Sequence, residues 1–114
     1  MSVVIYIRNK KRWKQQEDSF YVGRPSPLSN PFIITESQTR AICIERYTSM
    51  LISAIQQNDP RIISALQKIE SHLKIHGKVN LVCWCSPEPC HADVIRNILL
   101  NKFHTGEWLV NGEI

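Results

Sequence analysis

The stretch "VNLVCWCSPEPCHADVI" spans residues 79–95 and changes its hydrophobic pattern in the middle. Residues 79–85 form a nearly continuous apolar run, which is typical of a strand that is buried on both faces. Two prolines follow, and from His91 onward apolar residues recur at helical spacing. A buried strand that leads directly into a helix is the unit from which parallel sheets are built. The stretch therefore predicts an α/β fold.

The sequence upstream of this stretch contains two more strand patterns and two helix patterns. Residues 2–8 (SVVIYIR) and 19–24 (SFYVGR) are short apolar runs, so both are predicted to be strands. Residues 35–57 open with Thr and Ser cap candidates and then show helical periodicity. Residues 59–74 begin with Asp59 and Pro60, a cap and a first-turn proline, and Gly77 is expected to end that helix.

These elements predict an α/β fold with a small mixed or mostly parallel sheet of about three to four strands, flanked by three helices in Rossmann-like layering. Residues 2–8 and 79–85 should be adjacent in the middle of this sheet, because a helical connection returns the chain in the same direction. The 114 residues suffice for one compact domain and are too few for two. Residues 1–114 are therefore interpreted as a single domain.

The composition is that of an ordinary soluble protein, with 43% hydrophobic and 21% charged residues. No apolar run reaches the roughly 18 residues needed to span a bilayer, and the first charges follow the hydrophobic stretch, the reverse of a signal peptide. We therefore expect a cytoplasmic protein without a membrane partner. In that compartment cysteines are reduced, buried, metal-bound or catalytic instead of paired in disulfides. The four are Cys43, Cys83, Cys85 and Cys90.

The net charge of +4 is mild and favours anionic partners. Five of the fourteen basic residues lie in residues 8–14 (RNKKRWK), around one tryptophan. This run is a candidate patch for nucleic acid, with a stacking platform among phosphate-binding side chains. The alternative is a solvated loop that joins two strands. The candidate residues are Lys10, Lys11, Arg12, Trp13 and Lys14.

The cysteine-rich turn allows three interpretations. Cys83, Cys85, Cys90 and His91 match the Cys3His ligand set of zinc sites, but no second ligand cluster exists in the sequence, so zinc is not favoured. Alternatively, Cys90 at a helix N-terminus beside His91 is a nucleophilic thiolate, with Asp93 as an acid/base candidate or an orienter of His91. In the third interpretation Cys83 belongs to the core, Asp93 or Ser86 caps the helix, and His91 binds nothing.

The loop at residues 23–32 (GRPSPLSNPF) is the second candidate for chemistry. Its prolines restrict the backbone, and its guanidinium, hydroxyl and amide groups suit an anionic, hydrogen-bonding ligand. The alternative is a structural crossover. In α/β sheets ligands bind beyond the carboxyl ends of strands, so we expect this loop and the cysteine-rich turn to form one pocket. The candidate ligand contacts are Gly23, Arg24, Ser26, Asn30, Arg40, Tyr47, Cys85 and Ser86.

The two blocks, with "TRAICIERYTSML" between them, resemble the domain of unknown function family 4326 over about Val3 to Phe103. These are small bacterial and phage proteins with a G-R-P-x-x-x-x-N-P-F loop and a C-W-C-x-P-x-x-C-H-x-D-V block. Ser29 and Ala92 stand where the family often has glycine, which restricts the backbone at both points. The positions that match the family pattern are Gly23, Arg24, Pro25, Asn30, Pro31, Phe32, Arg40, Tyr47, Cys83, Trp84, Cys85, Pro87, Cys90, His91 and Asp93.

The leading hypothesis is a pocket for a nucleotide or nucleoside-phosphate-like ligand. Arg24 and Arg40 would hold the anion, Asn30 would orient sugar or base, and Cys90, His91 and Asp93 would meet the reacting end. Hydrolysis or transfer at a glycosidic or phosphoester bond fits an enzyme, and the same pocket fits a phage or bacterial protein that only binds a nucleotide signal. A small Cys3His zinc module that contacts nucleic acid or protein is the third class, and a homo-oligomer is compatible with each.

Overall fold

The apolar runs form a three-stranded parallel sheet in the computed structural model, which describes residues 2–13, 18–85 and 88–109. Strands β1 (Val4–Asn9) and β2 (Ser19–Tyr21) both pair in parallel with β3 (Lys78–Cys83). The strand order is β1-β3-β2. The predicted α/β fold with a small, mostly parallel sheet is thus confirmed. Only β3 lies in the middle, however, and β1 is at an edge because no further strand pairs with it among the described residues.

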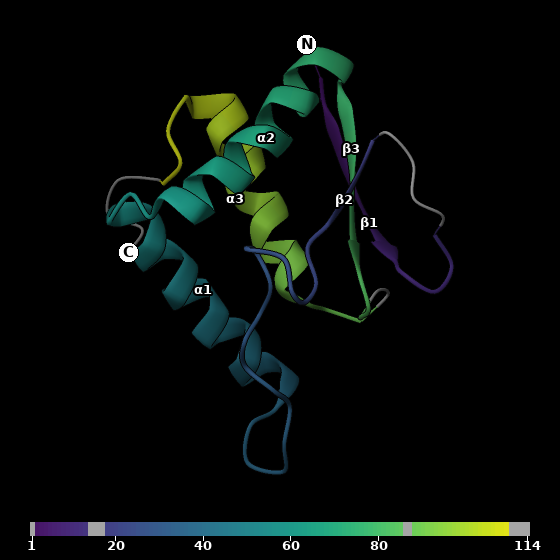
Figure 1. The fold of residues 1–114 in the computed structure, drawn as a ribbon, viewed down its shortest axis with the longest axis vertical. Helices are drawn as coiled ribbons and strands as arrows, with labels where there is room; N and C mark the ends of the chain where they lie inside the picture. Colours follow the sequence, from purple (N-terminus) through teal and green to yellow (C-terminus); the bar gives the residue numbers. More distant parts are fainter. Residues whose placement is uncertain (1, 14–17, 86–87, 110–114) are drawn as a thin grey trace.

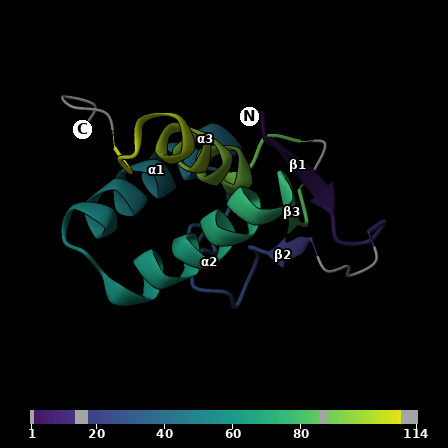
Figure 2. The ribbon, with the colours of Figure 1, turned by 90° about the horizontal axis from the view of Figure 1, so that it is seen from above.

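Three helices cover one side of this sheet (Figures 1 and 2). They are α1 (Arg40–Gln56), α2 (Pro60–His76) and α3 (His91–Thr105). Helices α2 and α3 contact the strands, and α1 packs against α2 and α3. Within the described part of the chain, no helix has the length and apolar character that crossing a membrane requires.

The helix ends show how the sequence sets these boundaries. Asp59 caps α2 by accepting a hydrogen bond from the Arg61 N–H at 3.0 Å, and Gly77 ends the helix in the left-handed region with φ 78°, both as predicted. The stretch predicted to contain a helix opens at residue 35, whereas α1 begins at Arg40. Thr39 is the N-cap of α1, and the backbone of Thr35 pairs with that of Gln38 in a turn before it.

The core lies between the sheet and the helices. Ile5, Val79, Leu81 and Cys83 share one buried cluster with apolar side chains of all three helices. The five residues from Val79 to Cys83 are each at most 4% exposed, which confirms a strand buried on both faces. On the face of β1 turned away from the helices, Val4 and Tyr6 are 40% and 41% exposed.

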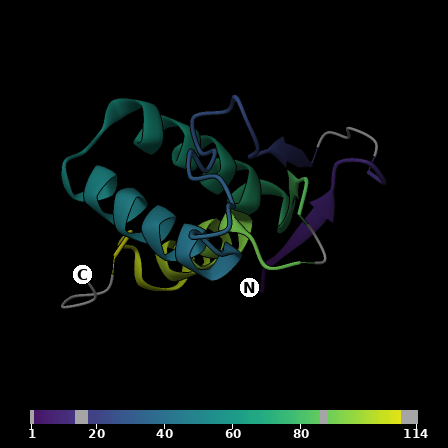
Figure 3. The same cartoon turned by 90° about the horizontal axis from the view of Figure 1, so that it is seen from below.

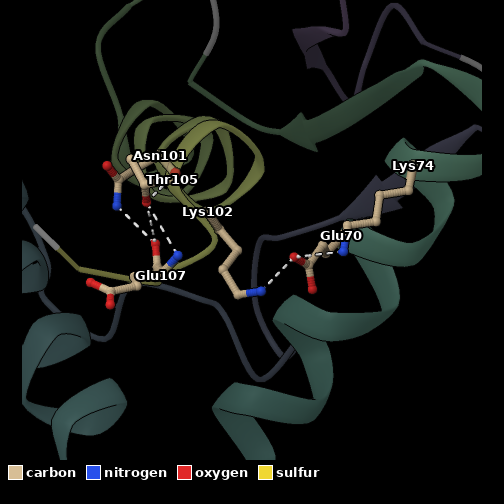
Figure 4. Close-up of polar contacts among 6 residues, drawn as sticks. All are labelled: Glu70, Lys74, Asn101, Lys102, Thr105 and Glu107. Carbon is tan, nitrogen blue, oxygen red and sulfur yellow. Dashed lines mark hydrogen bonds and ion pairs between the residues drawn. The ribbon is translucent and has the colours of Figure 1, made fainter. Parts of the chain in front are cut away.

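A buried carboxylate ties α2 to α3 (Figure 4). Glu70 on α2 accepts a hydrogen bond from Lys102 Nζ on α3 at 2.9 Å, and Lys74 Nζ lies 3.6 Å from the same oxygen. Beyond the end of α3, the Glu107 carbonyl accepts from Asn101 Nδ2 at 2.9 Å. The Lys102–Glu70 contact fixes α3 against α2, and the Asn101 contact holds the segment after α3 against the end of that helix.

Candidate functional site

The two predicted loops meet around one cavity of about 480 Å³, beyond the carboxyl ends of β2 and β3. Figure 3 views the molecule from the end at which these segments lie. The residues that line the cavity come from the end of β2 and the following loop, from α1, and from the turn between β3 and α3. They are Tyr21, Gly23, Arg24, Asn30, Phe32, Ile33, Ile34, Arg40, Cys43, Ile44, Trp84, Cys85, Pro89, Cys90 and His91.

Aromatic side chains join the separate segments of the rim. The Tyr21 hydroxyl accepts a hydrogen bond from Trp84 Nε1 at 2.8 Å and donates to the Arg24 carbonyl at 2.7 Å. A Cβ at Gly23 would lie 2.5 Å from the Tyr21 hydroxyl, so the backbone approaches this ring only because residue 23 is glycine. Trp84 itself is 53% exposed. The rim therefore offers flat apolar surface to a ligand.

Two arginines supply positive charge at the cavity. Arg24 Nε donates to the Asn30 carbonyl at 3.1 Å and its Nη2 to the Phe32 carbonyl at 3.5 Å. Arg40 Nη1 donates to the Pro89 carbonyl at 3.2 Å, which links α1 to the turn before α3. Neither guanidinium forms an ion pair with a carboxylate in the described ranges. Both keep unneutralised charge and N–H donors beside the cavity.

Three other predicted ligand contacts are placed differently by the structure. Asn30 lines the cavity, but its Oδ1 accepts from the Phe32 N–H at 2.9 Å and so shapes the loop. Tyr47 is fully buried in the core, where its hydroxyl donates to the Leu28 carbonyl at 2.7 Å and burial raises its pKa. Ser26 lines a neighbouring hollow between its own loop and α2. Tyr47 and Ser26 therefore do not reach the cavity.

The cysteines at the turn are arranged differently from the prediction. The strand ends at Cys83, so Cys85 lies beyond it, half-buried at the cavity. Cys83 Sγ lies 3.3 Å from Cys90 Sγ, and both side chains are buried. This hydrogen bond and burial raise the pKa of Cys90, although its sulfur accepts the Ala92 N–H at 3.4 Å. Cys90 is thus a neutral thiol that serves as the N-cap of α3, and the predicted low-pKa thiolate is not supported.

His91 is held at the wall of the cavity as a neutral side chain. Its Nε2 lies 2.6 Å from the Val22 carbonyl, and its ring packs edge-on against Tyr47 with centroids 5.1 Å apart. Because a carbonyl only accepts, Nε2 carries the proton, and Nδ1 is an acceptor in the neutral ring, with no hydrogen-bond donor among the described residues. Burial lowers the pKa of His91, which favours this neutral form.

Asp93 is a helix-capping residue. Its Oδ2 accepts a hydrogen bond from the Cys90 N–H at 3.0 Å, and its Oδ1 pairs with Arg96 Nη2 at 3.2 Å. Asp93 is not among the residues that line the cavity. Both oxygens are thus engaged by Cys90 and Arg96, as the capping alternative expected, and the role of Asp93 as an acid/base group or orienter of His91 stays a prediction.

The four candidate zinc ligands, Cys83, Cys85, Cys90 and His91, do not form a metal site among the described residues. His91 directs Nε2 at a backbone carbonyl, and the described residues contain no group of three or more His, Cys, Asp or Glu side chains suited to a metal ion.

Three residues named in the sequence predictions, Ser86, Pro87 and Lys14, lie outside the described residues. Tyr21, Phe32 and Trp84 also line the cavity, although they were not among the predicted ligand contacts. For Trp84 a signal existed, because neighbouring residues of a strand point to opposite faces and Trp84 follows the buried Cys83.

Comparisons with known proteins give one result. The family model described as Domain of unknown function (DUF4326) matches residues 5–101 of the 114. Neither the comparison with curated proteins nor that with solved structures found a match. Both sequence blocks that build the cavity lie inside the matched range. Because the match covers most of its length, the chain belongs to the DUF4326 family.

Proposed function

We propose that the cavity binds a small ligand with a flat ring system and an anionic group, and that this ligand is a nucleotide or nucleoside phosphate. The observation that carries the proposal is the pair Arg24 and Arg40, two guanidinium groups without carboxylate partners in the described ranges, beside an aromatic rim. Isolated cations at a largely apolar cavity favour an anionic ligand.

The dimensions and chemistry of the cavity suit this class. Its volume of about 480 Å³ falls within the range of small-molecule sites, about 300–1,000 Å³. Arg24 and Arg40 would donate hydrogen bonds to phosphate oxygens, and Trp84 or Phe32 would stack on the base. The unprotonated Nδ1 of His91 would accept a hydrogen bond from a hydroxyl or amino group of the ligand.

Binding without turnover is the form of the proposal that the side chains favour. Cys90 is a neutral thiol, His91 is neutral and fixed by Val22, and Asp93 caps α3. The described residues that line the cavity include no carboxylate. Hydrolysis or transfer at a glycosidic or phosphoester bond would therefore have no carboxylate acid or base among these residues. The enzyme alternative predicts turnover of the ligand instead.

Isothermal titration with adenosine, guanosine and uridine monophosphates tests the proposal. We expect Arg40→Ala to weaken nucleotide binding about tenfold or more, because a charged hydrogen bond contributes about 1.5–3 kcal/mol. Arg61→Ala is the matched control, since Arg61 is an exposed arginine on α2 that does not line the cavity. The free nucleosides and inorganic phosphate should each bind more weakly than the nucleotide.

Two results would contradict the proposal. The first is that no nucleotide binds at millimolar concentration, and the second is that Arg40→Ala binds as tightly as the unmodified protein. Chromatography of the ligand after long incubation separates binding from catalysis. Recovery of unchanged nucleotide supports a binding protein, whereas conversion of the nucleotide supports the enzyme alternative.

A further inference from the structure

The face of the sheet opposite the helices carries a group of aromatic and basic side chains. Residues in register share a face, and Tyr6 pairs with Asn80 while Arg8 and Tyr21 both pair with Val82. Ile5, Val79 and Leu81, one position away on their strands, lie in the core. Tyr6, Arg8 and Tyr21 therefore point away from the helices. Figure 2 shows that the helices lie on one side of the sheet.

Arg8 lies between two aromatic rings on this face. Its guanidinium carbon is 4.3 Å from the centroid of the Tyr6 ring and 4.5 Å from that of the Trp13 ring. Its Nε donates to Asn80 Oδ1 at 3.0 Å, and Trp13 Nε1 donates to the Ser19 hydroxyl at 2.7 Å. These contacts hold the rings and the guanidinium in one fixed layer, while Tyr6 stays 41% exposed.

Positive charge surrounds this layer. Lys10 Nζ lies 5.8 Å from the centroid of the Tyr21 ring, and Lys10, Lys11 and Arg12 are exposed in the turn that follows β1. None of these three residues, nor Arg8, forms an ion pair with a carboxylate in the part of the chain that the structure describes. Aromatic rings next to unpaired cations are the combination that proteins use to bind single strands.

We propose that this sheet face, defined by Tyr6, Arg8, Lys10, Trp13 and Tyr21, binds single-stranded nucleic acid. Bases of a single strand are free to stack on the exposed Tyr6 ring and on the half-buried Trp13 and Tyr21 rings, and the cations would contact its phosphates. A duplex keeps its bases stacked on one another and offers no ring to Tyr6. The proposal stands on residues outside the cavity except Tyr21, so it does not depend on nucleotide binding there.

Fluorescence anisotropy with a labelled fifteen-nucleotide oligothymidylate and a duplex of the same length tests this. The single strand should bind more tightly than the duplex. Tyr6→Leu keeps an apolar side chain but removes the aromatic ring, and should weaken binding about fivefold or more, whereas Tyr6→Phe should retain it. Lys10→Ala should lower the slope of log affinity against log salt by about 0.7, the value for one phosphate contact on a single strand.

Lys68→Ala is the matched control, because it removes an exposed lysine from α2 with the same change of charge. It should leave oligothymidylate binding unchanged, and circular dichroism should show that each variant is folded. Equal affinity for duplex and single strand would overturn the proposal, as would unchanged binding by Tyr6→Leu. Equal losses in Lys10→Ala and Lys68→Ala would also overturn it, because binding would then follow net charge instead of this face.

Discussion

His91 makes the stability of the protein depend on pH. Burial lowers its pKa in the folded state below the ordinary value of 6.5, which the unfolded chain keeps. Between the two pKa values only the unfolded chain binds the proton, so the free energy of unfolding falls as the pH drops below about 6.5. His91→Gln, whose amide can still donate to Val22, should reduce the difference in stability between about pH 7.5 and 5.5.

Denaturant unfolding at the two pH values measures this difference. His104→Gln on the same helix is the control, since His104 is exposed and its replacement should leave the pH dependence as in the unmodified protein. A pH dependence in His91→Gln equal to that of the unmodified protein would mean that His91 is not held neutral by burial.

The identity of the residues around the cavity was only partly predictable from the sequence. Gly23, Arg24 and Arg40 were predicted to contact the ligand and do line the cavity. Tyr47 shares the apolar face of α1 by its helical spacing, but its hydrogen bond to the distant Leu28 carbonyl was not predictable from that spacing. In one of the three interpretations Cys90 loses its proton at a helix N-terminus, and only the fold reveals that Cys83 lies beside it.

At the scale of elements, the pair of Glu70 and Lys102 is expected to stabilise the packing of α2 on α3. Lys102→Ala leaves a carboxylate that is only 10% exposed without its closest partner, so the free energy of unfolding should fall by about 2 kcal/mol. Lys74→Ala removes the longer, more exposed contact to the same carboxylate and should cost about 0.5 kcal/mol or less.

Urea unfolding of the two variants measures these values, and Glu70→Gln combined with Lys102→Ala should recover part of the loss because no buried charge remains. Equal destabilisation by Lys102→Ala and Lys74→Ala would contradict the assigned role of the shorter contact.

The positions of the helices and strands were more predictable from the sequence than the site residues, because local interactions set them. Asp59, Pro60 and Gly77 act on their own backbone, so the limits of α2 follow from the sequence. The start of α1 was less certain because several Thr and Ser residues compete as caps, and Thr39 is the one that accepts a hydrogen bond from α1. The order of the strands was harder still, since pairing depends on contacts far apart in the chain.

At the scale of the whole molecule, the cavity and the open sheet face meet at Tyr21 and Trp84. Trp84 lines the cavity and donates its indole N–H to the Tyr21 hydroxyl, while the Tyr21 ring lies beside Lys10 on the sheet face. If both surfaces bind as proposed, they share this junction. Trp84→Ala should then weaken both nucleotide and oligothymidylate binding about fivefold, because it removes a stacking ring and frees Tyr21.

Tyr6→Leu on the sheet face and Arg40→Ala at the cavity are the controls for Trp84→Ala. Tyr6→Leu should weaken only the oligonucleotide and Arg40→Ala only the nucleotide, since neither residue belongs to the other surface. Titration of the three variants with both ligands gives six affinities. If Trp84→Ala loses affinity for only one ligand, the two surfaces bind separately. If it loses affinity for both ligands while Tyr6→Leu and Arg40→Ala each lose affinity for one, Trp84 contributes to both binding surfaces.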